Sequence, residues 1–156
     1  NGVAAGAGAN VALACDIVVA KKSAVFVQAF SNISLIPDSG GTFMLPRLVG
    51  WQKASALMML ADKVDGHEEE RLGMIYRWYE DEDFEEAAWK LVEKLSQMPT
   101  KGLGLTKRLL NESVSNNLEE QLEAEGATQV IAAATEDFQE GVQAFLEKRR
   151  PLFKGK

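Results

Sequence analysis

The sequence predicts an α/β fold that becomes almost wholly helical after its first third. A loop of glycine and alanine at residues 1–9 runs directly into an apolar helical segment, and two short segments rich in β-branched residues follow at 16–20 and 24–28. A loop, a helix and strands in this succession are typical of an α/β arrangement. Beyond Gly50, apolar residues recur at helical spacing, and only one further short strand is expected.

The glycine and alanine loop is the most unusual stretch of the chain. Gly2, Gly6 and Gly8 free the backbone to adopt positive φ or to lie against a ligand, and the alanines between them keep neighbouring side chains short. From Asn10 the pattern predicts a buried helix, whose first turn has free N–H groups that suit a negative charge or a developing oxyanion. Close packing of a helix on a strand explains the same residues equally well. The loop matches the dinucleotide-binding fingerprint less well than either of these interpretations, because the third glycine of that fingerprint would fall at Val11.

A second turn-forming stretch follows the two predicted strands. After an apolar connection over residues 30–36, Pro37 stiffens the entry to the turn Asp38-Ser39-Gly40-Gly41. A helix is expected from Thr42, and Pro46 should break or kink it. Taken alone, Asp38 is best interpreted as a residue that holds the turn or caps this helix.

The second half carries clear signals for helix ends. Asp65 followed by Glu68 resembles a capping box for a short helix that closes at Gly73. A short strand is expected at 74–79, and Asp83 can cap the helix after it. The expected helices are 51–60, the two just described, and then roughly 102–115, 118–134 and 137–149.

Composition narrows the classes of function. The chain has 156 residues, 46% of them apolar, so it can bury a core. A net charge of −6 argues against general affinity for nucleic acid or an anionic membrane surface, and no apolar run approaches the ~20 residues of a membrane span. A single cysteine, Cys15, expected in the core, and the absence of a leader predict a cytoplasmic protein. The basic run 148–156 is interpreted as a solvated tail, and His67 is expected in solvent.

Three motifs occur in a specific order: NG…AGAG…CDIVVA in residues 1–20, ISLIPDSGGTFMLPRLVG in 33–50 and AFLEKRRPLF in 144–153. Together they resemble the enoyl-CoA hydratase/isomerase family, the crotonase superfamily. The resemblance implies a crotonase-like (ClpP/crotonase) spiral fold. Residues 1–60 would form the C-terminal part of its α/β core, and 61–156 a helical region that builds homotrimers, often paired as hexamers. Because the chain opens within the first motif, it is expected to lack the N-terminal part of its domain.

The resemblance also implies a chemistry. Family members bind an acyl-CoA thioester and stabilise an enolate oxygen with two backbone N–H groups, one of which maps to Ala7 between Gly6 and Gly8. The other belongs to the N-terminal part that this chain is expected to lack. The two glutamates with which hydratases add water map to Asn10 and Phe30, and neither side chain can exchange a proton.

Asp38 is then the remaining acid/base candidate. In isomerases of the family a carboxylate occupies this position of the turn. Burial beside Phe30, Ile33 and Leu35 would suit it to taking a proton from one carbon of the acyl chain and returning it two carbons away. The residues expected to contact the acyl group are Gly6, Gly8, Asn10, Phe30, Gly40 and Gly41.

Within the family, the motifs are most similar to the 1,2-epoxyphenylacetyl-CoA isomerase branch of phenylacetate degradation. Phe145 and Lys148 map to contacts of the adenine and the phosphates of coenzyme A. We expect no metal, no cofactor beyond the coenzyme A of the substrate, and neither nucleic acid nor membrane as a partner. Two alternatives stay open: an enoyl-CoA hydratase with unusual residues, and a catalytically silent crotonase fold that serves as a binding or assembly module.

Overall fold

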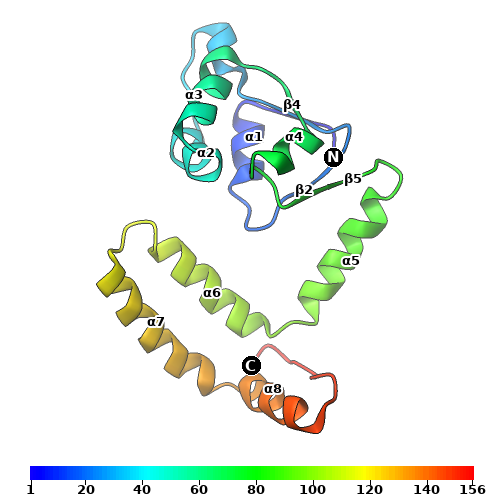
Figure 1. Cartoon of the computed structure of the whole chain (residues 1–156), viewed down its shortest axis with the longest axis vertical. Coiled ribbons are helices and arrows are strands. Elements are labelled where there is room, and N and C mark those ends of the chain that lie inside the picture. Colours follow the sequence, from blue (N-terminus) through cyan, green and yellow to red (C-terminus); the bar gives the residue numbers. More distant parts are fainter. The chain divides into compact units, whose positions relative to one another are not determined.

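A computed structural model describes all residues from 1 to 156. The chain divides into two compact units, residues 1–89 and residues 90–156, which are described separately (Figure 1). The first unit combines short strands with helices, and the second is entirely helical. None of the helices combines the length and the apolar character that crossing a bilayer requires.

The first unit contains two small sheets. β1 (Val3–Ala5) pairs in parallel with β3 (Val25–Val27), which pairs antiparallel with β4 (Val64–Asp65), so the strand order is β1-β3-β4. β2 (Val19–Lys21) pairs in parallel with β5 (Arg77–Tyr79). A parallel pair requires a crossover, and α1 provides it between β1 and the strands that follow.

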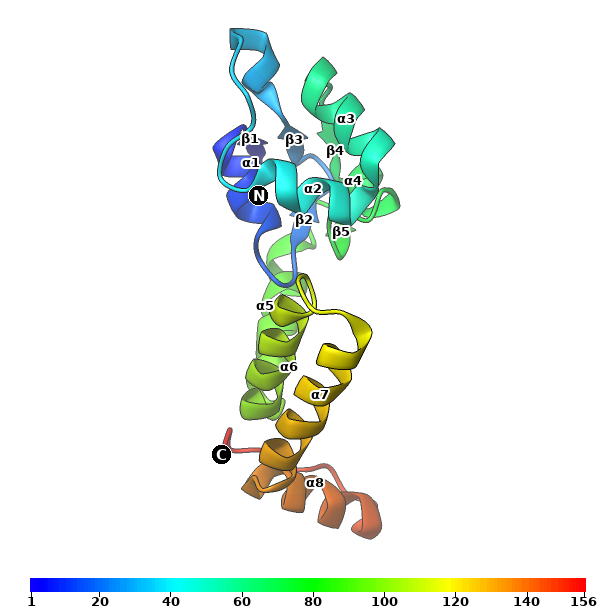
Figure 2. The same ribbon diagram turned by 90° about the vertical axis from the view of Figure 1, so that its left-hand side faces the viewer.

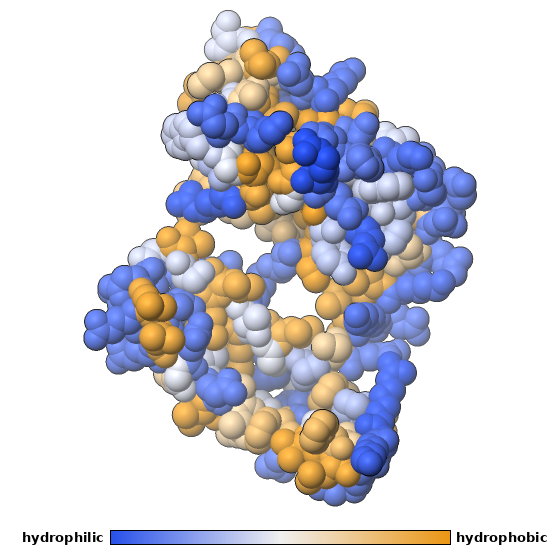
Figure 3. Space-filling model, viewed as in Figure 1, coloured by the Kyte–Doolittle hydropathy of each residue, from blue (hydrophilic) through white to orange (hydrophobic).

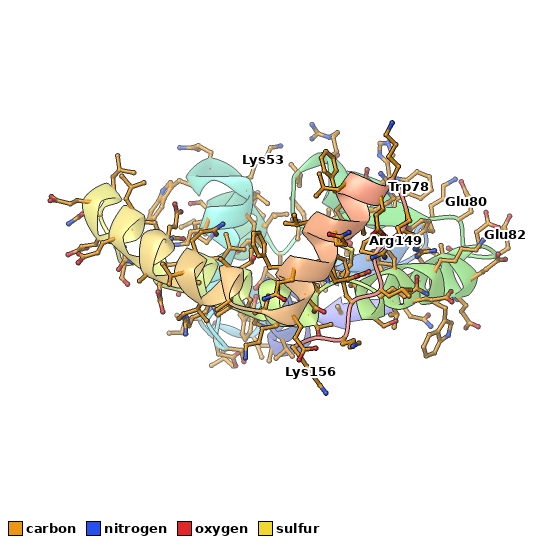
Figure 4. The ribbon with its side chains drawn as sticks, turned by 90° about the horizontal axis from the view of Figure 1, so that it is seen from below. Lys53, Trp78, Glu80, Glu82, Arg149 and Lys156 are labelled. Carbon is orange, nitrogen blue, oxygen red and sulfur yellow. The ribbon has the colours of Figure 1, made fainter.

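Polar contacts close the end of the β2–β5 pair. Lys22 Nζ lies 2.9 Å from a carboxylate oxygen of Glu80 and 5.4 Å from the centroid of the Trp78 ring. The backbone N–H of Ser23 donates to Asp81 Oδ1 at 3.0 Å. Figure 4 labels Trp78, Glu80 and Glu82, which follow one another along this stretch of the chain. These contacts join the turn after β2 to the turn after β5.

Helices cover the strands of the first unit. They are α1 (Ala7–Leu13), the 3₁₀ helix η1 (Ala29–Ile33), α2 (Gly41–Val49), α3 (Trp51–Leu60) and α4 (Gly66–Arg71). α1 packs on α2, and α2 packs on α3 (Figure 1). The larger buried apolar side chains of this core are Leu13, Phe26, Leu45, Leu57, Val64, Met74 and Ile75. Burying such a cluster is the main source of this unit's stability.

The second unit is built from α6 (Thr100–Glu112), α7 (Leu118–Ala133) and α8 (Glu136–Glu147). α6 and α7 lie side by side in both views (Figures 1 and 2). α5 (Phe84–Ser96) runs from the end of the first unit into the second. A complete capping box opens α7: Asn117 accepts from the Glu120 N–H at 3.0 Å, and Glu120 accepts from the Asn117 N–H at 2.9 Å.

The C-terminal segment is bound to α8 rather than free. Asp137 accepts hydrogen bonds from the backbone N–H groups of Lys154 and Gly155, at 2.7 and 2.8 Å. Arg149, labelled in Figure 4, donates to both carboxylate oxygens of Glu140 and, together with the Leu152 N–H, lowers the pKa of that carboxyl to about 2. The basic residues of this run, Lys148, Arg149, Arg150, Lys154 and Lys156, are exposed, as predicted, whereas its backbone donors bind buried or ion-paired carboxylates on the helix.

Several boundaries differ from the sequence-based prediction. The first helix begins at Ala7 rather than Asn10, and the β1 strand, within the predicted loop, was not expected. α2 continues through Pro46 to Val49, since the proline removes only one backbone donor and the surrounding helix keeps its other bonds. Cys15 is exposed rather than buried. The predicted boundary at residue 60, between the family's α/β core and its helical C-terminal region, stays a prediction.

Candidate functional site

The N-terminus of α1 presents backbone N–H groups without partners in the chain. Gly6 adopts φ +53°, donates its N–H to the Val27 carbonyl at 2.9 Å, and accepts from the Ala9 and Asn10 N–H groups with its own carbonyl. This leaves the N–H of Ala7, the first helical residue, unbonded, as helix geometry dictates. Ala7 and Gly8 are both exposed, so a ligand can reach the donor.

Phe30 packs directly on the glycine loop. A Cβ added to Gly6 would lie 3.5 Å from the Phe30 ring, in ordinary van der Waals contact, so the positive φ rather than crowding selects glycine there. Phe30 is buried within η1. The structure therefore brings together two predicted residues, Gly6 and Phe30, which follow the parallel strands β1 and β3 at the same edge of the sheet.

The Asp38 turn is a tight reversal with two consecutive residues at positive φ. Ser39 has φ +48° and Gly40 φ +77°, and the Gly41 N–H donates to the Asp38 carbonyl at 2.9 Å. This is the backbone pattern of a type I′ turn, in which glycine is preferred and serine is strained by roughly 1 kcal/mol. The turn leads directly into α2, whose N-cap is Gly40.

Asp38 itself is exposed in the chain, and so are Ile33 and Leu35, at 69% and 59%. The expectation that these apolar residues bury the carboxyl is wrong for this chain, because the connection between η1 and the turn runs over the surface. The exposed carboxylate is free to meet a ligand from solvent.

Asn10 joins the glycine helix to the Asp38 turn. Its side chain is 1% exposed, and its Nδ2 donates to the Asp38 carbonyl at 2.9 Å. Its Oδ1 accepts from Gln28 Nε2 at 2.7 Å. A Cβ on Gly41 would lie 2.3 Å from Asn10 Nδ2, so Gly41 leaves the space that the Asn10 amide occupies. Asn10 therefore contacts both Asp38, 28 residues away in the sequence, and Gly41 of the same turn.

Phe145 and Lys148 belong to the other unit. Phe145 is exposed on α8 and, with Phe138 and Val142, lines an apolar cavity of about 460 Å³. Lys148 ends α8 in a left-handed conformation, with φ +55°. No group of three or more His, Cys, Asp or Glu side chains is arranged to hold a metal ion. His67 is exposed, and its ring centroid lies 6.0 Å from that of Trp78.

Sequence reasoning missed two buried polar residues. Gln28 is 3% exposed, and its Oε1 has no partner. Glu69 in α4 is fully buried with neither carboxylate oxygen hydrogen-bonded. Burial raises the pKa of Glu69 to about 7, the Asp65 carboxylate adds to this, and the nearby Phe26 N–H opposes it. For Gln28, its place one alternation after Phe26 on β3 could have signalled an inward side chain; Glu69 lies in an acidic run that gives no such signal.

The family model for enoyl-CoA hydratase/isomerase matches residues 1–156. Over its whole length, the chain is 46% identical to 1,2-epoxyphenylacetyl-CoA isomerase of Escherichia coli K12 and covers 60% of that protein. It is 44% identical to a probable enoyl-CoA hydratase of Rhodobacter capsulatus, again over its whole length, and covers 61% of that protein. It superposes on an enoyl-CoA hydratase of Geobacillus kaustophilus with a TM-score of 0.95 at 35% identity, covering 61% of that chain. A putative enoyl-CoA hydratase of Streptomyces coelicolor gives the same score at 39% identity, with 57% covered. The chain thus spans about three fifths of the length of these relatives.

Proposed function

Because the chain belongs to the enoyl-CoA hydratase/isomerase family and has the crotonase fold, we propose that it carries the proton-transfer site of an acyl-CoA isomerase. The observation that carries the proposal is the Asp38 turn: an exposed carboxylate whose backbone is hydrogen-bonded to the helix that presents the Ala7 N–H. The proposed reaction is a 1,3-proton shift on an enoyl-CoA or a ring-epoxide-CoA thioester.

In the proposed mechanism the Asp38 carboxylate takes a proton from the carbon next to the thioester carbonyl. The C–H electron pair moves into an enolate, whose oxygen accepts a hydrogen bond from the Ala7 N–H. The carboxylic acid then returns the proton two carbons away, which regenerates the thioester carbonyl and moves the double bond. One acid/base group is sufficient, because Asp38 is a carboxylate again once it has returned the proton.

A hydratase is the second candidate, because a relative at 44% identity bears that name. Water addition through two carboxylates is disfavoured by the residues at the corresponding positions. Asn10 is buried with both polar ends engaged, and Phe30 is a buried hydrocarbon ring on Gly6. Neither can activate water.

Substrate and assembly follow from the same proposal. The similarity to an epoxyphenylacetyl-CoA isomerase favours an aromatic or other bulky acyl group, which Gly6, Gly8, Phe30 and Gly40 would border. Phe145 and Lys148 would contact the coenzyme A moiety. We propose a homotrimer, or a hexamer made of two trimers. A silent binding or assembly module is the alternative that the uncovered apolar surface of the second unit favours.

The test is Asp38→Asn in the protein that the complete gene encodes, assayed for conversion of a 3-enoyl-CoA to a 2-enoyl-CoA. General acid–base catalysis contributes about 10²- to 10⁴-fold, so kcat should fall by that factor with KM nearly unchanged. Asp62→Asn, which removes an exposed charge after α3, is the matched control and should keep the wild-type rate. An Asp38→Asn variant with wild-type turnover would remove the proposed function.

A further inference from the structure

Asn10 occupies a place where a polar side chain is costly. Its neighbours on α1, Ala9 and Leu13, belong to the apolar core, and both ends of its amide are engaged within the chain. Gln28, its partner, is equally buried and carries an unpaired Oε1. A buried polar pair that is only partly satisfied contributes little net stability, so a positional role accounts better for its presence.

The hydrogen bond from Asn10 reaches the one atom that defines the Asp38 turn. The Asp38 carbonyl accepts from the Gly41 N–H within the turn and from Asn10 Nδ2 across it, each at 2.9 Å. Ser39, at φ +48°, would relax from its left-handed conformation if the turn opened. Asn10 thus provides an external bond that holds a strained turn closed.

Asn10 also lies one helical turn after Ala7 on the same face of α1. The same short helix therefore carries the proposed oxyanion donor at its first residue and the anchor of the Asp38 backbone three residues later. Any shift of Asn10 changes the position of the carboxylate relative to that donor. Gln28 restrains the shift, because its Nε2 donates to Asn10 Oδ1 from the residue that follows strand β3.

We infer that Asn10 and Gln28 are positioning residues that set the place of the Asp38 carboxylate relative to the Ala7 N–H, and that Asn10 does not contact the acyl group. This inference rests on the proposed isomerase function for its catalytic consequence. Its structural part stands independently, since it concerns the bond between two elements of the fold. Gly41 then serves to admit the Asn10 amide rather than to approach the substrate.

The test combines a structural readout with a catalytic one, in the protein encoded by the complete gene. The variants are Asn10→Ala, which removes both bonds, and Gln28→Met, which removes only the donor to Asn10 at nearly constant volume. Asn111→Ala, an exposed asparagine of α6, is the matched control. The rate of hydrogen exchange of the Gly41 amide reports how often the turn opens. With a substrate deuterated at C2, the fraction of deuterium that is found in the product reports how often Asp38 returns the proton that it removed.

Asn10→Ala should speed exchange at Gly41 by about tenfold or more and lower both kcat and deuterium transfer, with Gln28→Met changing each in the same direction by less. In an Asp38→Asn background, Gln28→Met should lower kcat no further. Unchanged Gly41 exchange in both variants would overturn the inference, as would faster exchange with wild-type deuterium transfer. A wild type without isomerase turnover, but with Gly41 exchange that responds to Asn10→Ala, would retain the anchoring and remove the proposed function.

Discussion

The two units of the chain differ in how they bury their side chains. The first unit has a continuous apolar core of at least ten residues around α1, α2 and β3. In the second unit only Thr128, Asp137 and Ala144 are buried. Large apolar side chains of α7 and α8 face solvent, and Figure 3 shows apolar surface gathered over α8. Both units expose large apolar side chains, but only the first also has a core that can specify its fold by its own contacts.

This difference also separates two kinds of polar group. In the first unit the notable polar groups, Asn10, Gln28 and Glu69, are buried and bear on the geometry of the candidate site or on pH dependence. In the second, polar groups cap helices, and the carboxylates of Asp137 and Glu140 bind the C-terminal segment. Substitutions should therefore act on catalysis and folding in one unit, and on association in the other.

The largest expected effect is the loss of subunit association when a charge is placed on the exposed apolar surface of α7. Ile131→Glu on α7 would place an unpaired carboxylate in the proposed subunit interface, at a cost of about 5 kcal/mol, and should dissociate the assembly. Gln129→Glu adds the same charge to α7 without removing an apolar side chain. Sedimentation velocity measures both. An Ile131→Glu protein with the mass of the wild-type assembly would show that α7 is not in the interface.

Gly41→Ala should be the most damaging small substitution in the first unit. The new methyl group would lie 2.3 Å from Asn10 Nδ2 and must displace the amide, so overpacking and the lost hydrogen bond together cost about 4 kcal/mol. The matched change, Gly126→Ala in α7, meets no atom within 4 Å and should stabilise its helix by about 1 kcal/mol. Denaturant unfolding compares the two. Equal and small effects would contradict the packing around Asn10.

Glu69 gives the first unit a stability that falls as pH rises, opposite in sign to the effect of the lowered pKa of Glu140 in the second unit. The pKa of Glu69 rises from 4.5 to about 7 on folding, so between these values the folded state holds the proton and the unfolded state has lost it. Stability is unaffected below pH 4.5, falls as pH rises through this window, and is lower by at most about 3 kcal/mol above it. Glu69→Gln should remove this slope in unfolding measured from pH 4 to 8, while Glu119→Gln, an exposed control, should keep it.

The smallest expected effect concerns the cap of α7. Asn117→Ala removes the side-chain acceptor for the Glu120 N–H and should destabilise the second unit by about 1 kcal/mol. Exchange of the first amides of α7 should accelerate, and exchange in β3 should remain unchanged. Faster exchange in both units would mean that they unfold together rather than separately.

Local signals in the sequence predicted the parts of the fold that are set locally. Asp65 caps α4, as the spacing to Glu68 indicated, and the three C-terminal helices lie within a few residues of their expected bounds. β1 and β4 were missed because two or three residues show no periodicity, and their pairing with β3 is what makes them strands.

The candidate site was predictable only in outline. Glycine-rich and turn-forming motifs mark Gly6, Ala7 and Asp38 in the sequence itself. The bond from Asn10 to the Asp38 carbonyl spans 28 residues, and the space left by Gly41 depends on it, so no local pattern contains either. The crotonase resemblance predicted which loops carry chemistry, whereas the tertiary fold determines what holds them together.

The proposed site moves a proton and does not add water. The most direct measurement is the ratio of two rates for the wild-type gene product, isomerisation of a 3-enoyl-CoA and hydration of a 2-enoyl-CoA. With one carboxylate and no second acid/base group at Asn10 or Phe30, isomerisation should exceed hydration by about 100-fold or more. Hydration as fast as isomerisation would mean that the chain is part of a hydratase and that Asp38 does not act as a lone proton shuttle.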